Sequence, residues 1–296
     1  MYNKLQKLKQ EKDAVILAHY YAPVEVQKAA DFIGDSFYLA KAAKSATQKT
    51  IVFCGVNFMG ESAKLLNPQK TVLMPDITAD CPMAHMVTEE KIKKVKEENE
   101  DTAVVCYINS TAKIKALSDV CVTSANALNI VRKLPNKNIF FIPDGNLGRY
   151  IKEQVPEKNV ILNDGYCPIH HTLTADILNK QKSEHPNALV LVHPECQKEI
   201  IEMADYVGST SGIIEFAKKS DNDEFIICTE PGVGYELNKI GKKFYFLGDD
   251  FICADMKLNT LEKLCDCLEN GTGEIFIDDE LREKALRPLD KMLELA

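Results

Sequence analysis

The sequence predicts an α/β protein made of three homologous α/β/α sandwich units with parallel sheets, arranged with pseudo-threefold symmetry around a central active site. Three observations predict it. Short β-branched runs alternate with stretches of helical periodicity, which is typical of βαβ units. Several landmarks recur three times in one order. The last landmark is a cysteine at positions 81, 167 and 253, with intervals of 167 − 81 = 86 and 253 − 167 = 86 residues.

Each unit carries the same landmarks before its cysteine. The first is an apolar run that ends in polar residues, the second is an Asp-led turn, and the third is a glycine before a helical stretch. Unit by unit they lie at Ala14, Asp31 and Gly60, at Ala103, Asp119 and Gly148, and at Ala188, Asp205 and Gly234. We therefore place the units at residues 1–86, 87–171 and 172–256, and we expect residues 257–296 to form a helical C-terminal tail.

The elements of the first unit follow from its apolar pattern. Val15–Ala18, Ile51–Cys54 and Val72–Met74 are predicted to be buried strands, because these short runs are apolar and rich in β-branched residues. Val24–Ala30 and Ser36–Ala46 carry apolar residues at helical spacing. Strands that alternate with helices form right-handed crossovers, so each sheet should be parallel. Ligands bind beyond the carboxyl ends of such strands, and three units around one axis would direct their loops at one shared pocket.

Composition and charge exclude several functions. The net charge of −8 argues against nonspecific nucleic-acid binding. No apolar run approaches the roughly 20 residues that a membrane span needs. Met1–Lys12 is polar and basic and contains no apolar signal region, so a cytoplasmic protein is expected. In that reducing compartment, ten cysteines are better explained as buried thiols or metal ligands than as disulfides.

Three cysteines, Cys81, Cys167 and Cys253, stand in loops after strands at equivalent positions of the repeat. Equivalent positions around a threefold axis converge on one point, as the ligands of one metal centre must. Three thiolates suit a catalytic zinc ion or a four-iron cluster with one iron free of protein ligand, and the spacing leaves both open. Apolar surroundings indicate core thiols at Cys54, Cys106, Cys121 and Cys228. No role is assigned to Cys196, Cys265 and Cys267.

Polar residues end the first strand of every unit, where a core has no use for them and a shared active site does. They are His19, Tyr21, Tyr107, Asn109, His193 and Glu195. A second set lies at predicted helix N-termini, which suit carboxylates or phosphate, although ordinary N-capping also explains them. It comprises Ser36, Ser124, Ser209 and Thr210. His85 and His170 lie near the cysteine loops and are weaker candidates for contacts behind the metal ligands.

Several distinctive motifs follow one another from about residue 14 to 261. They include Ile16-Leu-Ala-His-Tyr-Tyr21, Ala79-Asp-Cys-Pro-Met-Ala84, Cys167-Pro-Ile-His170, Val192-His-Pro-Glu-Cys196 and Met256-Lys-Leu-Asn-Thr-Leu261. In sequence and order these motifs closely resemble the quinolinate synthase family. The resemblance implies an enzyme of NAD biosynthesis that condenses iminoaspartate with dihydroxyacetone phosphate to quinolinate, phosphate and water. It also implies a [4Fe-4S] cluster on Cys81, Cys167 and Cys253, whose fourth iron has no protein ligand and acts as a Lewis acid.

The resemblance also implies roles for the polar residues. Tyr21 and Glu195 would transfer protons, with His19 and His193 completing the catalytic set. Tyr107 and Asn109 would join the two histidines in orienting substrate. The seats for carboxylates and phosphate would be Ser36, Ser124, Ser209 and Thr210. Expected partners are the two small substrates and the enzyme that supplies iminoaspartate, with neither nucleic acid nor membrane.

Two other functions stay open on the residues alone. One is a three-cysteine zinc hydrolase or lyase with Glu195 as general base. The other is a non-catalytic iron–sulfur sensor that signals cluster loss to a partner. Some family members carry a Cys-x-x-Cys redox switch near the C-terminus, but Cys265 and Cys267 have a different spacing, so no switch is expected here.

Overall fold

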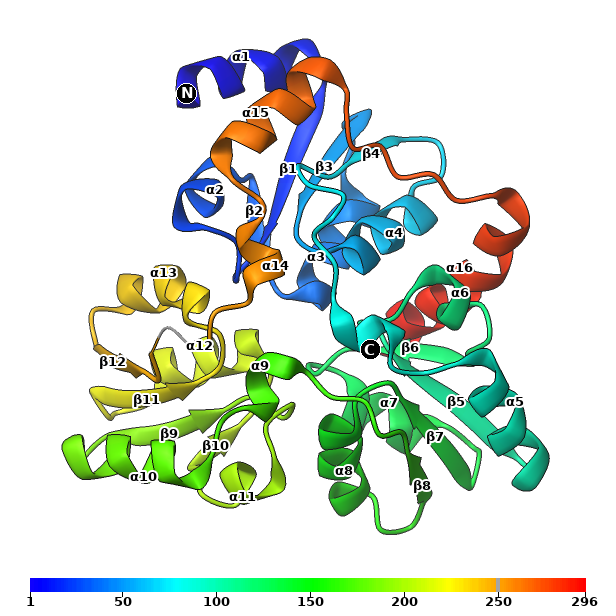
Figure 1. The fold of residues 1–296 in the computed structure, drawn as a ribbon, viewed down its shortest axis with the longest axis vertical. Helices are drawn as coiled ribbons and strands as arrows, with labels where there is room; N and C mark the ends of the chain where they lie inside the picture. The colour runs from blue at the N-terminus through cyan, green and yellow to red at the C-terminus, as the bar shows by residue number, and fades with distance from the viewer. Residues whose placement is uncertain (249–250) are drawn as a thin grey trace.

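The computed structural model describes residues 1–248 and 251–296, and it shows three α/β units around a common centre (Figure 1). Each unit contains a four-stranded sheet, with orders β2-β1-β3-β4, β6-β5-β7-β8 and β10-β9-β11-β12. The first strand of every unit is thus second in its sheet. Every strand pair within these sheets is parallel. The predicted α/β class with three parallel-sheet units is confirmed.

The strands are short and mostly buried, as expected of sheets covered on both faces. The first sheet contains β1 (Ala14–His19), β2 (Phe32–Gly34), β3 (Thr50–Cys54) and β4 (Thr71–Leu73); the second contains β5 (Thr102–Tyr107), β6 (Val120–Val122), β7 (Asn138–Ile142) and β8 (Asn159–Leu162); the third contains β9 (Leu189–Val192), β10 (Tyr206–Val207), β11 (Glu224–Cys228) and β12 (Lys243–Phe246). The three strands predicted for the first unit correspond to β1, β3 and β4.

Helices connect the strands and cover the sheets (Figure 1). The first unit contains α1 (Tyr2–Glu11), α2 (Val24–Ala29), α3 (Ser36–Ser45) and α4 (Asn57–Leu66). The next part of the chain contains η1 (Pro82–His85), α5 (Glu89–Glu98), α6 (Ala112–Lys115), α7 (Ala127–Lys133) and α8 (Gly145–Gln154). The third part contains α9 (Pro168–His171), α10 (Ala175–Glu184), α11 (Lys198–Ile201), α12 (Thr210–Lys219), η2 (Pro231–Val233), α13 (Gly234–Leu237) and η3 (Asn238–Ile240), and the last part contains α14 (Ala254–Lys257), α15 (Leu261–Asn270) and α16 (Asp279–Leu295). The predicted helices of the first unit match α2 and α3 within one residue.

The Asp-led turns of the repeat have one structural role. In each unit the aspartate exchanges two hydrogen bonds with the first strand, since its carboxylate accepts from a strand N–H and its own N–H donates to the carbonyl of that same residue. The carboxylate bonds run from Ile16 N to Asp31 at 2.8 Å, from Val104 N to Asp119 at 2.7 Å and from Val190 N to Asp205 at 2.8 Å. This contact fixes the turn before the second strand of each sheet.

The loops that contain the three candidate metal-binding cysteines carry the chain from one unit to the next. After each loop, a threonine N-caps the following helix, at Thr88, Thr174 and Thr260, with intervals of 174 − 88 = 86 and 260 − 174 = 86 residues. The helix capped by Thr88, α5, contacts β5 of the second unit, and the helix capped by Thr174, α10, contacts α11 of the third. The helix capped by Thr260, α15, packs against α1, α2 and β3 of the first unit, so the chain path closes into a ring.

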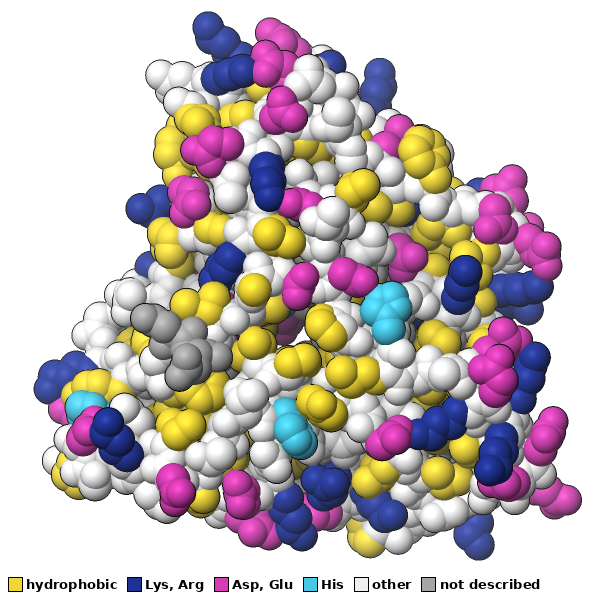
Figure 2. Space-filling view, viewed as in Figure 1, with side chains coloured by type: hydrophobic (Ala, Val, Ile, Leu, Met, Phe, Trp, Pro, Cys, Tyr) yellow, Lys and Arg dark blue, Asp and Glu magenta, His cyan; other side chains and the backbone are white. Residues whose placement is uncertain are grey.

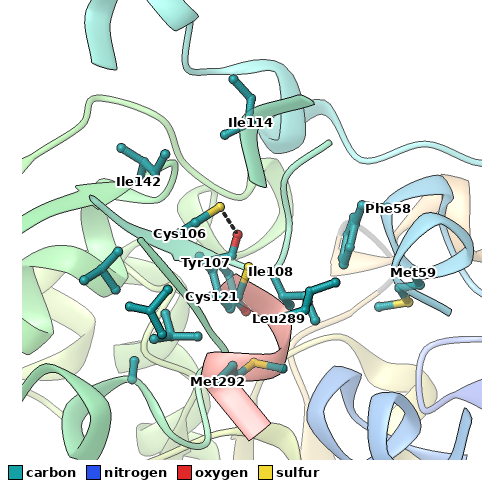
Figure 3. Close-up of a cluster of buried hydrophobic side chains, with 14 of the residues drawn as sticks. Phe58, Met59, Cys106, Tyr107, Ile108, Ile114, Cys121, Ile142, Leu289 and Met292 are labelled. Carbon is teal, nitrogen blue, oxygen red and sulfur yellow. Dashed lines mark hydrogen bonds between the residues drawn. The ribbon is translucent and has the colours of Figure 1, made fainter. Parts of the chain in front are cut away.

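The C-terminal helix α16 covers the second sheet. It contacts α6 and β6, and its buried side chains Leu289 and Met292 belong to the same core as Cys106 and Cys121 (Figure 3). Those two cysteines are register partners on β5 and β6 and are fully buried, as predicted for core thiols. Within the described residues, no helix has both the length and the apolar character that crossing a membrane requires.

Candidate functional site

A central cavity of about 190 Å³ lies at the carboxyl ends of the strands, where the three units meet. The face of the molecule in Figure 2 is hollowed near its centre, with mostly hydrophobic side chains beside the opening. Residues from all three units line the cavity. The predicted site residues among them are His19, Tyr21, Ser36, Cys81, Tyr107, Asn109, Ser124, Cys167, His193, Glu195, Thr210 and Cys253. Ser209 does not line it; its hydroxyl N-caps α12 by accepting from the N–H of Gly212 at 3.2 Å.

The three cysteines occupy matching local structures. Each stands directly before a short helix, η1, α9 or α14, and proline follows two of them at the first helical position. Backbone N–H groups at the start of that helix favour the thiolate form and lower its pKa: those of Met83 and Ala84 for Cys81, of His170 for Cys167, and of Met256 for Cys253. Burial nevertheless raises the pKa of all three thiols, to about 11 for Cys253. Deprotonation of all three therefore calls for a bound cation.

The spacing of the sulfurs indicates the size of that cation. In a tetrahedral zinc site, with Zn–S bonds near 2.3 Å, the sulfurs lie about 3.8 Å apart. In the described part of the chain, the group whose donor atoms all lie within 4.8 Å of one another is Cys167, His170 and Glu195. The three cysteine sulfurs do not form such a group, although all three line one cavity. At least one pair of these sulfurs is therefore farther apart than a tetrahedral zinc ion would hold them.

The charges around the cavity are one-sided. Five acidic side chains line it: Asp35, Asp80, Glu195, Glu230 and Asp255. Among the described lining residues there is no lysine or arginine. Buried carboxylates and thiolates without a cation are costly, because the low dielectric does not stabilise uncompensated charge. The residues therefore fit a positively charged metal centre.

A chain of short polar contacts runs between two tyrosines and crosses all three units. The Tyr107 hydroxyl donates to Glu195 Oε1 at 2.6 Å. His170 Nδ1 lies 2.7 Å from Glu195 Oε2 and 3.2 Å from Cys167 Sγ. His170 Nε2 lies 2.9 Å from Thr229 Oγ1, which in turn lies 2.7 Å from the Tyr21 hydroxyl. With the proton of His170 on Nδ1, every donor in this chain meets an acceptor.

The same chain perturbs the acidity of its members. Burial raises the pKa of Tyr21 and Tyr107, which keeps both phenols protonated. Burial also disfavours the charged form of Glu195, but the nearby His193 and His170 and the hydrogen bond from Tyr107 outweigh it and lower the pKa of Glu195. Glu195 therefore stays ionised although it is buried, and the two phenols beside it keep their protons as hydrogen-bond donors.

The two predicted catalytic histidines have the same local geometry. The N–H of Tyr21 donates to His19 Nδ1 at 3.2 Å, and the N–H of Glu195 donates to His193 Nδ1 at 3.3 Å. Burial lowers the pKa of both imidazoles to about 3, so both are neutral with the proton on Nε2. The Nε2–H of His193 lies 3.2 Å from the Ser124 hydroxyl oxygen. Each imidazole therefore offers a neutral N–H donor.

Two lining groups have unused hydrogen-bonding capacity. Asn109 Oδ1 and Thr123 Oγ1 are buried and have no partner among the described residues. Since buried polar atoms are almost always paired, these two mark positions where a ligand would bind. Asn109 was predicted from the sequence, whereas Thr123 was not.

Sequence reasoning also missed Thr229 and Glu230, and it gave His170 little weight. Thr229 and Glu230 directly follow β11, the third strand of the third unit. The ends of all parallel strands in a sheet meet at one edge, so the residues after the third strands were as good candidates as those after the first. By contrast His85, paired with Asp80 at 2.6 Å, is exposed and does not line the cavity.

Comparisons with known proteins agree with this site. The sequence profile of the family described as "Quinolinate synthetase A protein" matches residues 3–294. The chain is 57% identical to the quinolinate synthase of Fusobacterium nucleatum, over 100% of this chain and 99% of that one. It is 52% identical to the quinolinate synthases of Caldicellulosiruptor bescii and Clostridioides difficile, each over 99% of this chain and 97% of the relative. The chain therefore belongs to the quinolinate synthetase A family.

Proposed function

We propose that this chain is a quinolinate synthase, which condenses iminoaspartate with dihydroxyacetone phosphate to quinolinate, phosphate and water in NAD biosynthesis. The observation that carries the proposal is the cavity itself: three cysteines and five acidic side chains line it, and no described lining residue is a lysine or an arginine. Anionic substrates with carboxylate and phosphate groups would be repelled from such a cavity unless a cationic centre were bound there.

That centre is proposed to be a [4Fe-4S] cluster held by Cys81, Cys167 and Cys253. When bound, the cluster supplies an iron without a protein ligand, which polarises a substrate oxygen or nitrogen as a Lewis acid. Thiolate ligation of this kind requires a reducing compartment, which supports a cytoplasmic location. Because imines hydrolyse in water, iminoaspartate must come from an enzyme that oxidises an amino acid nearby, and that enzyme is the proposed partner.

The protein's own residues would handle protons and orientation. Condensation to an aromatic ring requires imine formation, keto–aldo isomerisation and loss of water, and each step moves protons. Glu195 accepts a proton and Tyr107 and Tyr21 donate one, through the chain that includes His170 and Thr229. The Nε2–H groups of the two neutral histidines, His19 and His193, donate to developing oxyanions. Asn109, Ser36, Ser124 and Thr210 bind substrate carboxylates and phosphate, and Ser209 supports Thr210 by capping its helix.

Anaerobic purification tests the proposal directly. We expect a brown protein with roughly four irons and four sulfides per chain. It should form quinolinate from the two substrates, and exposure to oxygen or a chelator should abolish both the colour and the turnover. A colourless, zinc-loaded and fully active protein would favour the zinc enzyme instead. A cluster-loaded protein without turnover would favour the sensor.

Replacing Thr229 by valine should slow turnover without removing iron. Valine keeps the shape of the side chain but breaks the link between the Tyr21 hydroxyl and His170 Nε2. Proton transfer by positioned groups typically contributes 10²–10⁴-fold, so loss of one link is expected to lower kcat by roughly tenfold to a hundredfold. The matched control is Thr50→Val. Thr50 is the first residue of β3, at the end of the strand that points away from the cavity, and its hydroxyl donates to the Lys12 carbonyl. Equal kcat in the Thr229 variant and wild type would remove the relay from the mechanism.

A further inference from the structure

Lys257 connects two units beside the cavity without lining it. It is the last residue of α14, four positions after Cys253. Its ammonium donates to the backbone carbonyl of Tyr21 at 2.6 Å and pairs with Glu230 Oε1 at 2.7 Å. One side chain thus joins the cysteine loop to Tyr21, just after β1 in the first unit, and to Glu230, two residues after β11 in the third.

Glu230 is the second half of this connection. Its carboxylate is 1% exposed, against 29% for the Lys257 side chain. Oε1 also accepts from the N–H of Cys253 at 3.3 Å, and Oε2 accepts from the N–H of Gly232 at 2.6 Å. The ion pair therefore holds the backbone of a proposed cluster ligand on one side and the backbone of a proposed catalytic residue on the other.

The backbones that the pair joins lie in unusually close contact. A Cβ atom at Gly232 would lie 2.8 Å from the Tyr20 carbonyl oxygen and 2.8 Å from the Tyr21 Cα, so only glycine permits the approach. Gln27, which is fully buried, donates through Nε2 to the carbonyls of Tyr20 and Ala22 at 2.8 Å and of Gly232 at 3.1 Å. The carbonyl between them, that of Tyr21, is the one that Lys257 binds.

The equivalent positions in the other two units do not make this connection. His85 and His171 also lie four residues after their cysteines. In the described contacts, the side chain of His85 bonds to Asp80 of its own loop, and that of His171 bonds to Asn146 of its own unit. The link between units at this position therefore belongs to the third cysteine loop, where the chain returns to the first unit.

We propose that Lys257, with Glu230, is a positioning residue that fixes the Tyr21 hydroxyl relative to Thr210 and Thr229. The Tyr21 hydroxyl lies 2.8 Å from Thr210 Oγ1 and 2.7 Å from Thr229 Oγ1, and both threonines belong to the third unit. These bonds form only while the first and third units keep their relative position. Lys257 holds that position at the backbone of Tyr21 itself, and it touches no atom of the proposed relay.

Lys257→Met tests the proposal in the full, cluster-loaded chain. Methionine keeps the length of the side chain and removes both contacts. We expect kcat to fall at least tenfold, with KM changed less than threefold and with wild-type iron and sulfide content. Hydrogen–deuterium exchange, measured by mass spectrometry, should be faster in peptides covering residues 19–23 and 230–234 and unchanged in the second unit. Lys257→Arg, which keeps the charge and the donors, should recover most of both properties.

The matched control is Lys263→Met. Lys263 forms a comparable pair with Asp76 at 2.5 Å, but neither residue lines the cavity, so this variant should behave like wild type. If Lys257→Met does not accumulate as folded protein, the double variant Glu230→Gln/Lys257→Met, which leaves no unpaired buried carboxylate, is measured in the same way. Loss of iron in step with activity, or unchanged exchange at residues 19–23, would overturn the positioning role. The kcat readout rests on the proposed function; the exchange readout does not, so a wild type that forms no quinolinate would refute the function alone.

Discussion

Alanine at Cys81, Cys167 or Cys253 is expected to reduce bound iron to background and to abolish quinolinate formation, whereas alanine at Cys54 or Cys265 leaves both intact. The first three thiols line the central cavity, and each stands directly before a short helix at the equivalent position of its unit. Removing one leaves two ligands on a cluster that needs three. Cys54 and Cys265 are buried in the core between the first sheet and α15, where a thiol acts as a small apolar group.

Iron and sulfide analysis of anaerobically purified variants, together with the visible absorption spectrum, checks this prediction. Thermal unfolding should be measured beside it, because the core substitutions are expected to lower Tm by a few degrees while iron stays bound. Equal loss of iron in all five variants would show that the position in the repeat does not identify the ligands. Full iron content after any of the first three substitutions would remove that cysteine from the ligand set.

The fold was largely predictable because the chain repeats a local pattern. Asp31, Asp119 and Asp205 recur since each makes the same pair of bonds to the first strand of its unit. Hydrophobic runs identified the strands, and the alternation with helices implied parallel pairing. Both signals are local in sequence, and a threefold repetition makes chance agreement improbable.

Other repeated contacts could not be predicted, because their chemistry is common on any surface. Three lysines each donate to carbonyls at the C-terminal end of a helix in their own unit. Lys70 contacts the carbonyl of Ala46 after α3, Lys158 that of Leu134 after α7, and Lys242 that of Ser220 after α12. Such bonds satisfy the free carbonyls at a helix end. The packing of α16 on the second sheet was likewise invisible, since an amphipathic helix does not reveal which face of which unit it covers.

The site residues that lie at the ends of the equivalent first strands could be predicted from the repeat. The site residues in other loops could not. His19 and Tyr107 are the last residues of β1 and β5, and His193 directly follows the equivalent strand β9, so the repeat aligned them. The cavity, however, is formed by loops of three units, and Thr229, which does not line it, contacts two lining residues through a hydroxyl that looks ordinary in sequence. Its importance comes from two distances, 2.7 Å to the Tyr21 hydroxyl and 2.9 Å to His170, between residues far apart in the chain. Only the three-dimensional structure provides such information.

Glu195→Gln is expected to lower kcat by roughly 10²–10⁴-fold while the cluster stays bound. In the wild type, one carboxylate oxygen accepts from the Tyr107 hydroxyl at 2.6 Å and the other lies 2.7 Å from His170 Nδ1. Glutamine has one acceptor oxygen, so it can keep only one of these two contacts. When that oxygen accepts from Tyr107, the amide nitrogen faces Nδ1 as a second donor, and His170 must turn or move its proton to Nε2. A proton on Nε2 would make the Thr229 hydroxyl an acceptor instead of a donor. The substitution therefore removes the proposed proton acceptor and disturbs the contacts behind it.

The prediction separates two roles that geometry alone allows for Glu195. Glu195 is one of three residues whose donor atoms all lie within 4.8 Å of one another, with Cys167 and His170, so it could bind a metal rather than carry protons. Steady-state kinetics with iron analysis distinguishes these roles, and the matched control is Glu184→Gln at the exposed end of α10. Reduced kcat with full iron content assigns proton transfer to Glu195. Loss of iron assigns metal binding, and turnover within threefold of wild type excludes both, because neither role survives the replacement of a carboxylate by an amide.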